Sequence, residues 1–419
     1  MAASQCQEER SVSGYGIDKK AEFSSNISSD NSSHRHHNVD EAGGRHNDLL
    51  AERPSQGGNL SAFFNIVCVV AGTGTLGLPF SLAKGGWIGV GILVLSMFMS
   101  TYTGILIIRC IYYNGHTRLA SYQEIEIRGL TRAYVDISDK IWIWICCGVV
   151  SIPFVLMKTF KEVSLLSIFG VIATAVLVGV TMVESGIDYK NHKDTVKYDV
   201  AILRNLPVAV ATISVCFGGN VVYMHVEESM RYPHAWKKVL IWAMVLCCFM
   251  YSMVAIPAYL TYGPDAASPI LSSLPEGRPA KKVATIMIVA HVLLAAPVMM
   301  TSFALEVERV LNITVERRGR YKERLYRTVV RLAVMGVVGG IACSVPYFDS
   351  LLSLLGALGN CMLVYVLPIW FYWRLIGWRQ MRWYELIWCA VVLIIALLSC
   401  VIGSIDAIKS LHRDFTQGR

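Results

Sequence analysis

The chain has 419 residues, of which 54% are hydrophobic and only 16% are charged, and its mean hydropathy is +0.48. A soluble globular domain carries about 25% charged residues, so this composition excludes an ordinary soluble protein. The formal net charge is +8. In so apolar a chain, an excess of Lys and Arg indicates membrane topology rather than affinity for nucleic acid. We therefore expect an integral, multi-pass membrane protein in contact with the lipid bilayer, with no nucleic-acid partner.

Residues 1–58 differ from the rest of the chain because they are rich in Ser, Asn, His and charge. Such a segment cannot bury enough apolar surface to offset the entropy of ordering it, and we expect a disordered tail. The histidines His34, His36 and His37 are a conceivable metal site, but a solvated tail explains them better. The cysteines lie mostly inside apolar segments without metal-ligand spacing, so neither a metal nor a cofactor is expected.

Residues 59–405 contain ten apolar segments long enough to cross a bilayer or nearly so, followed by a short polar tail, 406–419. Every backbone polar group in a bilayer needs an internal partner, which makes these segments helices. The fold class is therefore all-α and polytopic. The segments are 60–83, 87–111, 141–157, 163–183, 200–225, 239–262, 282–305, 328–345, 349–373 and 383–405.

Basic residues cluster in alternate connections, which predicts their orientation because Lys and Arg concentrate on the cytoplasmic side. The rule places 158–161, 231–238, 306–331 and 374–382, together with the N-terminus, in the cytoplasm. It conflicts with the basic connection 109–140, since the single segment 141–157 cannot join two loops on one side. Either 141–157 is re-entrant, or a helix is missing near 112–140.

Two segments contain residues that an uninterrupted lipid-facing helix avoids. Glycines and a proline between Gly72 and Pro79 predict an unwound turn, as does the Gly218–Gly219 pair in 200–225. Paired discontinuous helices mark the substrate site of secondary transporters, because their free N–H and C=O groups can bind a carboxylate and a cation. The predicted substrate-binding residues are Gly72, Thr73, Gly74, Thr75, Leu76, Phe217, Gly218, Gly219 and Asn220. The alternative is that the small residues only allow close helix packing.

The spacing of the two breaks suggests an inverted repeat that is incomplete. Five segments run from the second break to residue 373, with one more after them, but only four run from the first break to the second. A five-plus-five repeat would therefore lack one helix in its first half, in agreement with the charge conflict.

Two polar residues at membrane depth are candidates for binding a coupling ion. His291 lies in the middle of segment 282–305, where ionisable groups are costly and often functional; a neutral helix-contact histidine is the alternative. Asn65 precedes Gly72 by two turns and could offer an oxygen to a cation or make a helix–helix hydrogen bond. Because the residues around His291 offer no hydroxyl or carboxylate for sodium, the pattern favours a proton.

Several motifs resemble those of the amino acid/auxin permease family over about residues 59–405. They are Asn65 with Gly72-Thr-Gly-Thr-Leu-Gly-Leu-Pro79, Gly85-Gly86-Trp87, Ser121-Tyr-Gln-Glu-Ile125, Phe217-Gly-Gly-Asn220 with Glu228-Ser-Met-Arg-Tyr-Pro233, and Ser353-Leu-Leu-Gly356-Ala-Leu-Gly359 with Pro368. The variants resemble the fungal and vacuolar branches most. Asn220 stands where that family usually has His, so no role of that histidine is transferred.

The resemblance implies eleven helices in an inverted-repeat, LeuT-like fold, a cytoplasmic N-terminus, and amino-acid transport driven by a proton or sodium gradient. This chain is shorter than that pattern: only residues 126–140 separate Ile125 from Trp142, which resembles the start of the fourth helix. It therefore lacks the family's third transmembrane helix, leaving about ten membrane segments.

We expect a proton-coupled carrier of neutral amino acids that works by alternating access, as a symporter or antiporter, in the vacuolar, another endomembrane or the plasma membrane. The alternative is a transporter-like sensor or regulator that does not transport because of the missing helix. An enzyme is not expected, because no catalytic cluster recurs at membrane depth.

Overall fold

The computed structural model describes residues 53, 56–111, 139–157, 160–192, 196, 198–202, 205–275, 277–311, 313, 319–344 and 356–417. Nearly all of them are helical, and within these ranges the only β-type pairing is an isolated bridge between Gly57 and Met230. The all-α expectation is confirmed. The expected tail lies mostly outside the described residues, although Arg53 and residues 56–58 are described.

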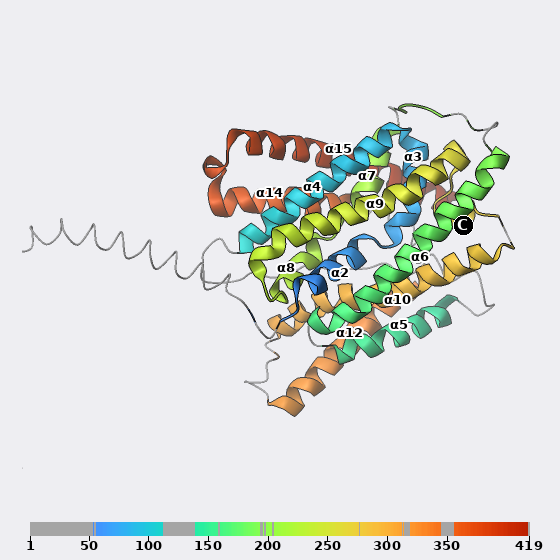
Figure 1. Ribbon diagram of the computed structural model, residues 1–419. Helices are drawn as coiled ribbons and strands as arrows, with labels where there is room; N and C mark the ends of the chain where they lie inside the picture. Colours follow the sequence, from blue (N-terminus) through green and yellow to red (C-terminus); the bar gives the residue numbers. More distant parts are fainter. Residues whose placement is uncertain are drawn as a thin grey trace, which may run out of the picture. The chain divides into compact units, whose positions relative to one another are not determined.

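The helices follow the predicted apolar segments closely (Figure 1). In chain order they are α2 (Asn59–Val70), η1 (Thr73–Gly77), α3 (Leu78–Gly85), α4 (Ile88–Ile111), α5 (Asp139–Leu156), α6 (Phe160–His192), α7 (Leu206–Cys216), α8 (Asn220–Glu228), η2 (Pro233–Ala235), α9 (Trp236–Tyr262), η3 (Gly263–Asp265), η4 (Ile270–Ser272), α10 (Pro279–Val310), α12 (Arg320–Ser344), η5 (Gly356–Asn360), η6 (Met362–Val366), α14 (Leu367–Tyr372), η7 (Trp373–Gly377), η8 (Trp378–Gln380) and α15 (Trp383–Gln417). Helix α15 continues beyond residue 405 and includes the polar residues up to Gln417.

Within the described ranges, seven helices are long and apolar enough to cross a membrane, and the bent pair Asn59–Val70 and Gly74–Gly85 makes up to eight. The remaining two predicted segments also form helices, but α5 has a short apolar stretch and α12 begins with several charged residues. The chain is therefore an integral, multi-pass membrane protein.

The two ends of the helix bundle are named here after an arginine on each. At the Arg53 face, Arg53 bonds the carbonyls of Glu227 and Glu228, so the start of α2 lies beside the end of α8. At the Arg278 face, Arg278 pairs with Glu184 and Asp188, which joins the start of α10 to the end of α6. The basic segments 231–238 and 306–311 lie at the Arg53 face, as the charge pattern predicts for one common side.

Four pairs of elements run in opposite directions through the bundle, as an inverted repeat requires. The broken helix α2–α3 runs from the Arg53 face and α7–α8 returns to it. Next, α4 is antiparallel to α9, and α5 to α12, where Cys147 lies beside Gly339 and the Phe154 carbonyl beside Arg331. Lastly, α6 and the η5–α14 segment also run oppositely. In the described part of the chain, α10 and the additional last helix α15 have no such counterpart.

The counterpart of α10 would fall between α4 and α5. Ile111 ends α4 at the Arg53 face, because α4 starts beside Asp199 and Val200 at the Arg278 face and has 24 residues, about 36 Å of helix. In contrast, α5 runs toward the Arg53 face and thus starts on the other side. Residues 112–138, on which the missing-helix prediction falls, lie outside the described residues. The two described ends that flank them nevertheless lie on opposite sides.

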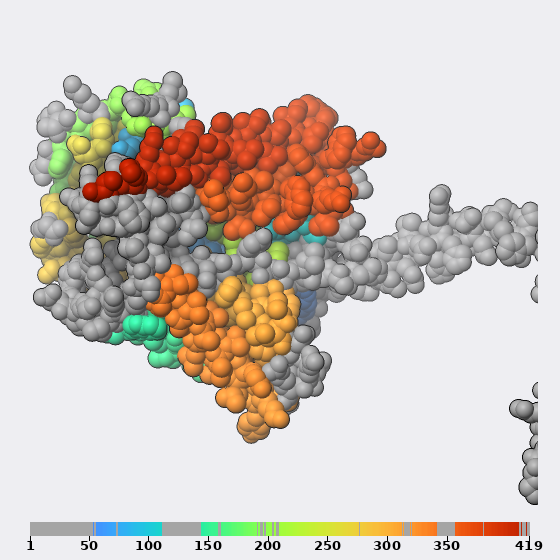
Figure 2. Space-filling model, turned by 180° about the vertical axis from the view of Figure 1, so that it is seen from behind, coloured from blue at the N-terminus to red at the C-terminus, as the bar shows by residue number. Residues whose placement is uncertain are grey.

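The first broken helix occupies the centre of the bundle. Its half α2 packs against α6 and α9, and the largest group of buried apolar side chains surrounds it. A second group joins α4 to α14 and α15, and a third joins α5 to α10 and α12. Figure 2 shows the α14–α15 pair on one part of the rear surface and α12 beside α5 on another. The breaks are thus held by helices from every part of the chain.

Candidate functional site

The first break frees backbone groups deep in the bundle. Helix α2 stops at Val70, and Gly72 has an extended backbone with φ −98° and ψ −143° before η1 begins. The three glycines and Pro79 explain the interruption locally, because glycine loses most entropy in a helix and proline lacks an N–H. The carbonyls of Val70 and Ala71 therefore need partners from outside their helix.

The second break is formed by Phe217, Gly218 and Gly219, between the end of α7 at Cys216 and the start of α8 at Asn220. Side chains from other helices bind its freed carbonyls: Ser100 donates to Phe217 O at 2.8 Å, and Asn360 donates to Ser214 O at 3.1 Å. A Cβ on Gly218 would lie 2.3 Å from the Asn360 side-chain oxygen. Glycine is thus required there for close packing as well as for unwinding.

The hydroxyl of Tyr251, on α9, connects the two breaks. It lies 2.5 Å from Val70 O and 2.6 Å from Cys216 O, the carbonyls at the ends of α2 and α7. A phenol has a single proton, so it can donate to only one of these oxygens at a time. The ring of Phe217 packs edge-on against Tyr251 at 5.2 Å between centroids, which fixes the position of the hydroxyl.

The two breaks also touch directly. The Cys216 thiol, which can donate to Gly74 O at 3.3 Å or to Thr212 O at 3.2 Å, lies at the first break, and a Cβ on Gly74 would lie 3.2 Å from Cys216 Cα. The sequence prediction that both breaks form one site is therefore consistent with their positions. The contact is closed, however, and leaves no room for an amino acid between Gly74 and Cys216.

His291 reaches the first break through a threonine. Its Nδ1 lies 2.8 Å from Thr174 Oγ1 and 3.0 Å from Gly170 O, and the Thr174 hydroxyl lies 3.2 Å from Ala71 O. Its Nε2 points toward Gly72, 3.4 Å from where a Cβ would stand. The imidazole is buried, and both alternatives for it remain: a helix contact and a proton-binding group.

The second coupling-ion candidate lies elsewhere. Asn65 is buried within α2, six residues before Ala71 and about 9 Å from it along the helix axis. The structure therefore does not place Asn65 and His291 at one ion site. Of the predicted η1 residues, Thr75 and Leu76 are buried, and the Thr75 hydroxyl has no hydrogen-bond partner among the described residues.

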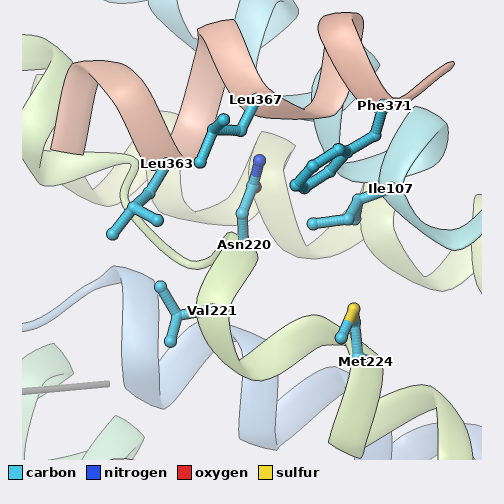
Figure 3. A pocket seen from close by; sticks show the side chains of 7 residues that line it. All are labelled: Ile107, Asn220, Val221, Met224, Leu363, Leu367 and Phe371. Carbon is cyan, nitrogen blue, oxygen red and sulfur yellow. The ribbon is translucent and has the colours of Figure 1, made fainter. Parts of the chain in front are cut away.

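A small, mostly apolar pocket lies beside the second break (Figure 3). It is lined by Ile107, Asn220, Val221, Met224, Leu363, Leu367 and Phe371. Asn220 points from the start of α8 toward α14, and its amide nitrogen donates to Val364 O at 2.8 Å. Its carboxamide oxygen is buried without a hydrogen-bond partner in the described part of the chain, so it can accept a hydrogen bond from a ligand.

The sequence analysis missed Ser100, Thr174, Tyr251 and Asn360, which hold the breaks in place. Thr174 and Asn360 are single polar residues within apolar or small-residue segments, whereas Ser100 and Tyr251 have polar neighbours. No local pattern distinguishes any of the four from a lipid-facing or packing residue. Outside tyrosine and cysteine, His291 is the one ionisable side chain in residues 59–83, 164–183, 206–224, 239–262 and 283–305, all within the described helices.

Comparison with known proteins gives a consistent result. The sequence model of the family described as transmembrane amino acid transporter protein matches residues 55–135 and 127–409. The chain is 24% identical to amino acid transporter AVT1H of Arabidopsis thaliana over 401 residues, covering 87% of this chain and 92% of that protein. It is 23% identical to the vesicular inhibitory amino acid transporter of Rattus norvegicus, covering 75% and 69% of the two chains.

Among solved structures, the crystal structure of MhsT in complex with L-phenylalanine aligns with a TM-score of 0.42 and 11% sequence identity. The alignment covers 84% of this chain and 92% of that one.

Proposed function

The chain belongs to the transmembrane amino acid transporter protein family, and from this premise we propose that it is a secondary active carrier of neutral amino acids. The observation that carries the proposal is the meeting of two broken, antiparallel helices at Gly74, Cys216 and Tyr251. Freed carbonyls there suit an ammonium group, and freed N–H groups suit a carboxylate.

The carbonyls next to Tyr251 support recognition of the substrate's ammonium group. The hydroxyl has one proton for two carbonyl oxygens, and Val70 O also accepts the Gly72 N–H at 2.8 Å. An ammonium group would bring further N–H donors to these oxygens. The unpartnered oxygen of Asn220 offers another acceptor on the other side of the second break.

The lack of fixed charge supports a neutral side chain in the substrate. A charged substrate side chain would need a counter-ion at membrane depth. In the described helices around the breaks, no Asp, Glu, Lys or Arg is present at that depth. His291, when neutral, adds only a hydrogen-bonding group.

The direct contact between the breaks supports alternating access. Because Gly74 and Cys216 touch, a substrate can enter only after the two broken helices separate. We propose that α2–η1 and α7–α8 part on one side at a time, with His291 binding the coupling proton and transmitting its charge state to Ala71 through Thr174.

We propose the vacuolar membrane, or another endomembrane, with the Arg53 face in the cytoplasm. The basic residues at this face support that orientation, because Lys and Arg accumulate on the cytoplasmic side of membrane helices. The relatives from plants and the vesicular relative support amino-acid substrates.

The test is uptake of a panel of radiolabelled amino acids by the purified full-length chain in proteoliposomes. We expect neutral amino acids to accumulate when a pH gradient is imposed, and replacement of sodium by choline to have no effect. A strict sodium requirement would refute the choice of ion, and uptake of only charged amino acids would refute the choice of substrate.

A second candidate function is a sensor or regulator that binds amino acids without moving them. It is favoured by the sequence, in which only residues 126–140 separate Ile125 from the family-like start of the fourth helix at Trp142. Binding of a radiolabelled amino acid without uptake under any gradient would identify it.

A further inference from the structure

Four side chains form a closed ring at the Arg53 face, away from the breaks. We name this group the His225 ring: His225 and Glu228 on α8, and Glu306 and Arg309 on α10. His225 Nδ1 lies 3.7 Å from Glu228 and its Nε2 lies 3.8 Å from Glu306. Arg309 closes the ring, 3.5 Å from Glu228 and 2.6 Å from Glu306.

The charge balance of the ring depends on one proton. With a neutral imidazole, two carboxylates face a single guanidinium, and the ring carries one net negative charge. When His225 is protonated, positive and negative groups alternate around the ring and its net charge is zero. Histidine is the side chain whose charge changes between about pH 5 and 8.

Other charged groups near the His225 ring are paired with one another. Glu227, beside it on α8, is paired with Arg53. Helix α2 carries no Asp, Glu, Lys, Arg or His, the charged residue of α4 is the exposed Arg109, and η6 contributes Tyr365. Helix α10, which also packs against α8, carries Glu308 near the ring, and this carboxylate is paired with Arg327 and Arg331.

The His225 ring has a buried histidine and two exposed charged side chains, an arrangement that suits proton exchange with water. The His225 side chain is 1% exposed, whereas those of Glu228 and Arg309 are 42% and 46% exposed. A proton can pass from water to Glu228 and then across the short gap to the imidazole. The buried position makes the attraction between the charges stronger than it would be in water.

The ring joins the two elements that carry the candidate site. Helix α8 begins at the second break, and α10 carries His291. We propose that the His225 ring is a second proton-binding site, and that a proton bound there holds the ends of α8 and α10 together and closes the Arg53 face. The part of the His225 ring in a transport cycle rests on the proposed function. Proton binding by the ring and closure of the Arg53 face do not depend on that function.

The test measures closure without measuring transport. Nitroxides on Tyr232→Cys, after α8, and Val310→Cys, at the end of α10, report the separation of the two ends by double electron–electron resonance in nanodiscs. Cys6 and Cys343 are replaced by serine, since the ten described cysteines are buried. We expect the short-distance population to grow by about threefold from pH 8 to pH 5.5.

Two variants and a control decide the assignment. In His225→Gln the distances should no longer depend on pH, and in Glu306→Gln the pH response should weaken because one carboxylate is lost. His234→Gln changes an exposed histidine of the neighbouring turn and should respond as the unchanged chain does. An unaltered pH response in folded His225→Gln, or no response in the unchanged chain, would overturn the proposal. If the unchanged chain shows the pH-dependent distances but takes up no amino acid, the carrier function is refuted and the proposed proton site is retained.

Discussion

The thiol of Cys216 lies 3.3 Å from the backbone carbonyl of Gly74 and 3.2 Å from that of Thr212. The first of these contacts brings together the interruptions of two antiparallel helices 142 residues apart in the chain. A Cβ on Gly74 would lie 2.9 Å from the Cys216 sulfur and 3.2 Å from its Cα. Because the second of these atoms is backbone, it cannot move aside as a side chain would. The first prediction follows from this contact.

Gly74→Ala should lower the affinity for neutral amino acids by about tenfold, and Gly74→Val should abolish binding, since overpacking a close contact costs about 1–3 kcal/mol. Gly77→Ala is the matched control, because its Cβ would meet only the Ser268 hydroxyl at 3.7 Å. Scintillation proximity binding to purified protein measures both. Equal affinity in Gly74→Val and Gly77→Ala would remove the first break from the binding site.

Tyr251→Phe should reduce uptake and lower the melting temperature of the purified protein, while the ring contact with Phe217 persists. The change removes the hydroxyl next to Val70 O and Cys216 O, and a lost buried hydrogen bond costs about 1 kcal/mol. Tyr102→Phe, whose hydroxyl contacts Cys389 far from the breaks, should keep normal uptake. If the two variants transport equally, Tyr251 has no special role in the site.

His291→Gln should eliminate the stimulation of uptake by a pH gradient but leave exchange of labelled for unlabelled substrate without a gradient. The reason is that Gln can still bond Thr174 or Gly170 O but cannot bind a proton. His412→Gln, in an exposed part of α15, should behave as the unchanged chain. Full stimulation by the gradient in His291→Gln would show that His291 is only a helix contact.

Arg331→Met should destabilise the protein by about 1–3 kcal/mol, because it removes the donor to the carbonyls of Phe154 and Met157 and leaves Arg327 as the remaining partner of Glu308. Arg331 is fully buried; it bonds Glu308 at 2.6 Å and the carbonyls of Phe154 and Met157 at the end of α5. The sequence analysis did not anticipate this group. The melting temperature should recover in part in the double variant Arg331→Met with Glu308→Gln. Equal melting temperatures for the unchanged chain, Arg331→Met and the double variant would contradict the role of this pair.

Labelling of introduced cysteines should place Tyr321→Cys on the same side of the membrane as an N-terminal tag and Lys190→Cys on the other. Tyr321 is 90% exposed and lies at the start of α12, on the Arg53 side, while Lys190 is exposed near the Arg278 face. An impermeant maleimide in sealed vesicles distinguishes the sides. Finding Tyr321→Cys opposite the tag would refute the orientation inferred from the basic residues.

Insertion of a family-like helix between Ile125 and Lys140 should increase uptake, because it would supply the counterpart that α10 lacks in the described part of the chain. Western blotting of surface-biotinylated or vesicle-inserted protein controls for expression. Failure to gain uptake in a well-inserted variant would favour the sensor or regulator.

The sequence by itself determined the class of protein, the helices and the positions of the breaks. A bilayer leaves helices as the way for an apolar chain to satisfy its backbone, and clustered glycines, accompanied by Pro79 in the first break, favour the interruption of a helix. These effects are local, so Gly72 to Leu76 and Phe217 to Gly219 were found without a structure, and the repeat count already pointed to residues 112–140.

Only the tertiary structure decided which residues from distant segments meet. The contacts of Tyr251 with Val70, of Thr174 with His291, and of His225 with Glu306 join residues at least 81 positions apart. The part that each of these side chains plays depends on how its helix is rotated and which helix faces it. Helix packing in a membrane sets both, through many weak contacts that leave no local sequence pattern.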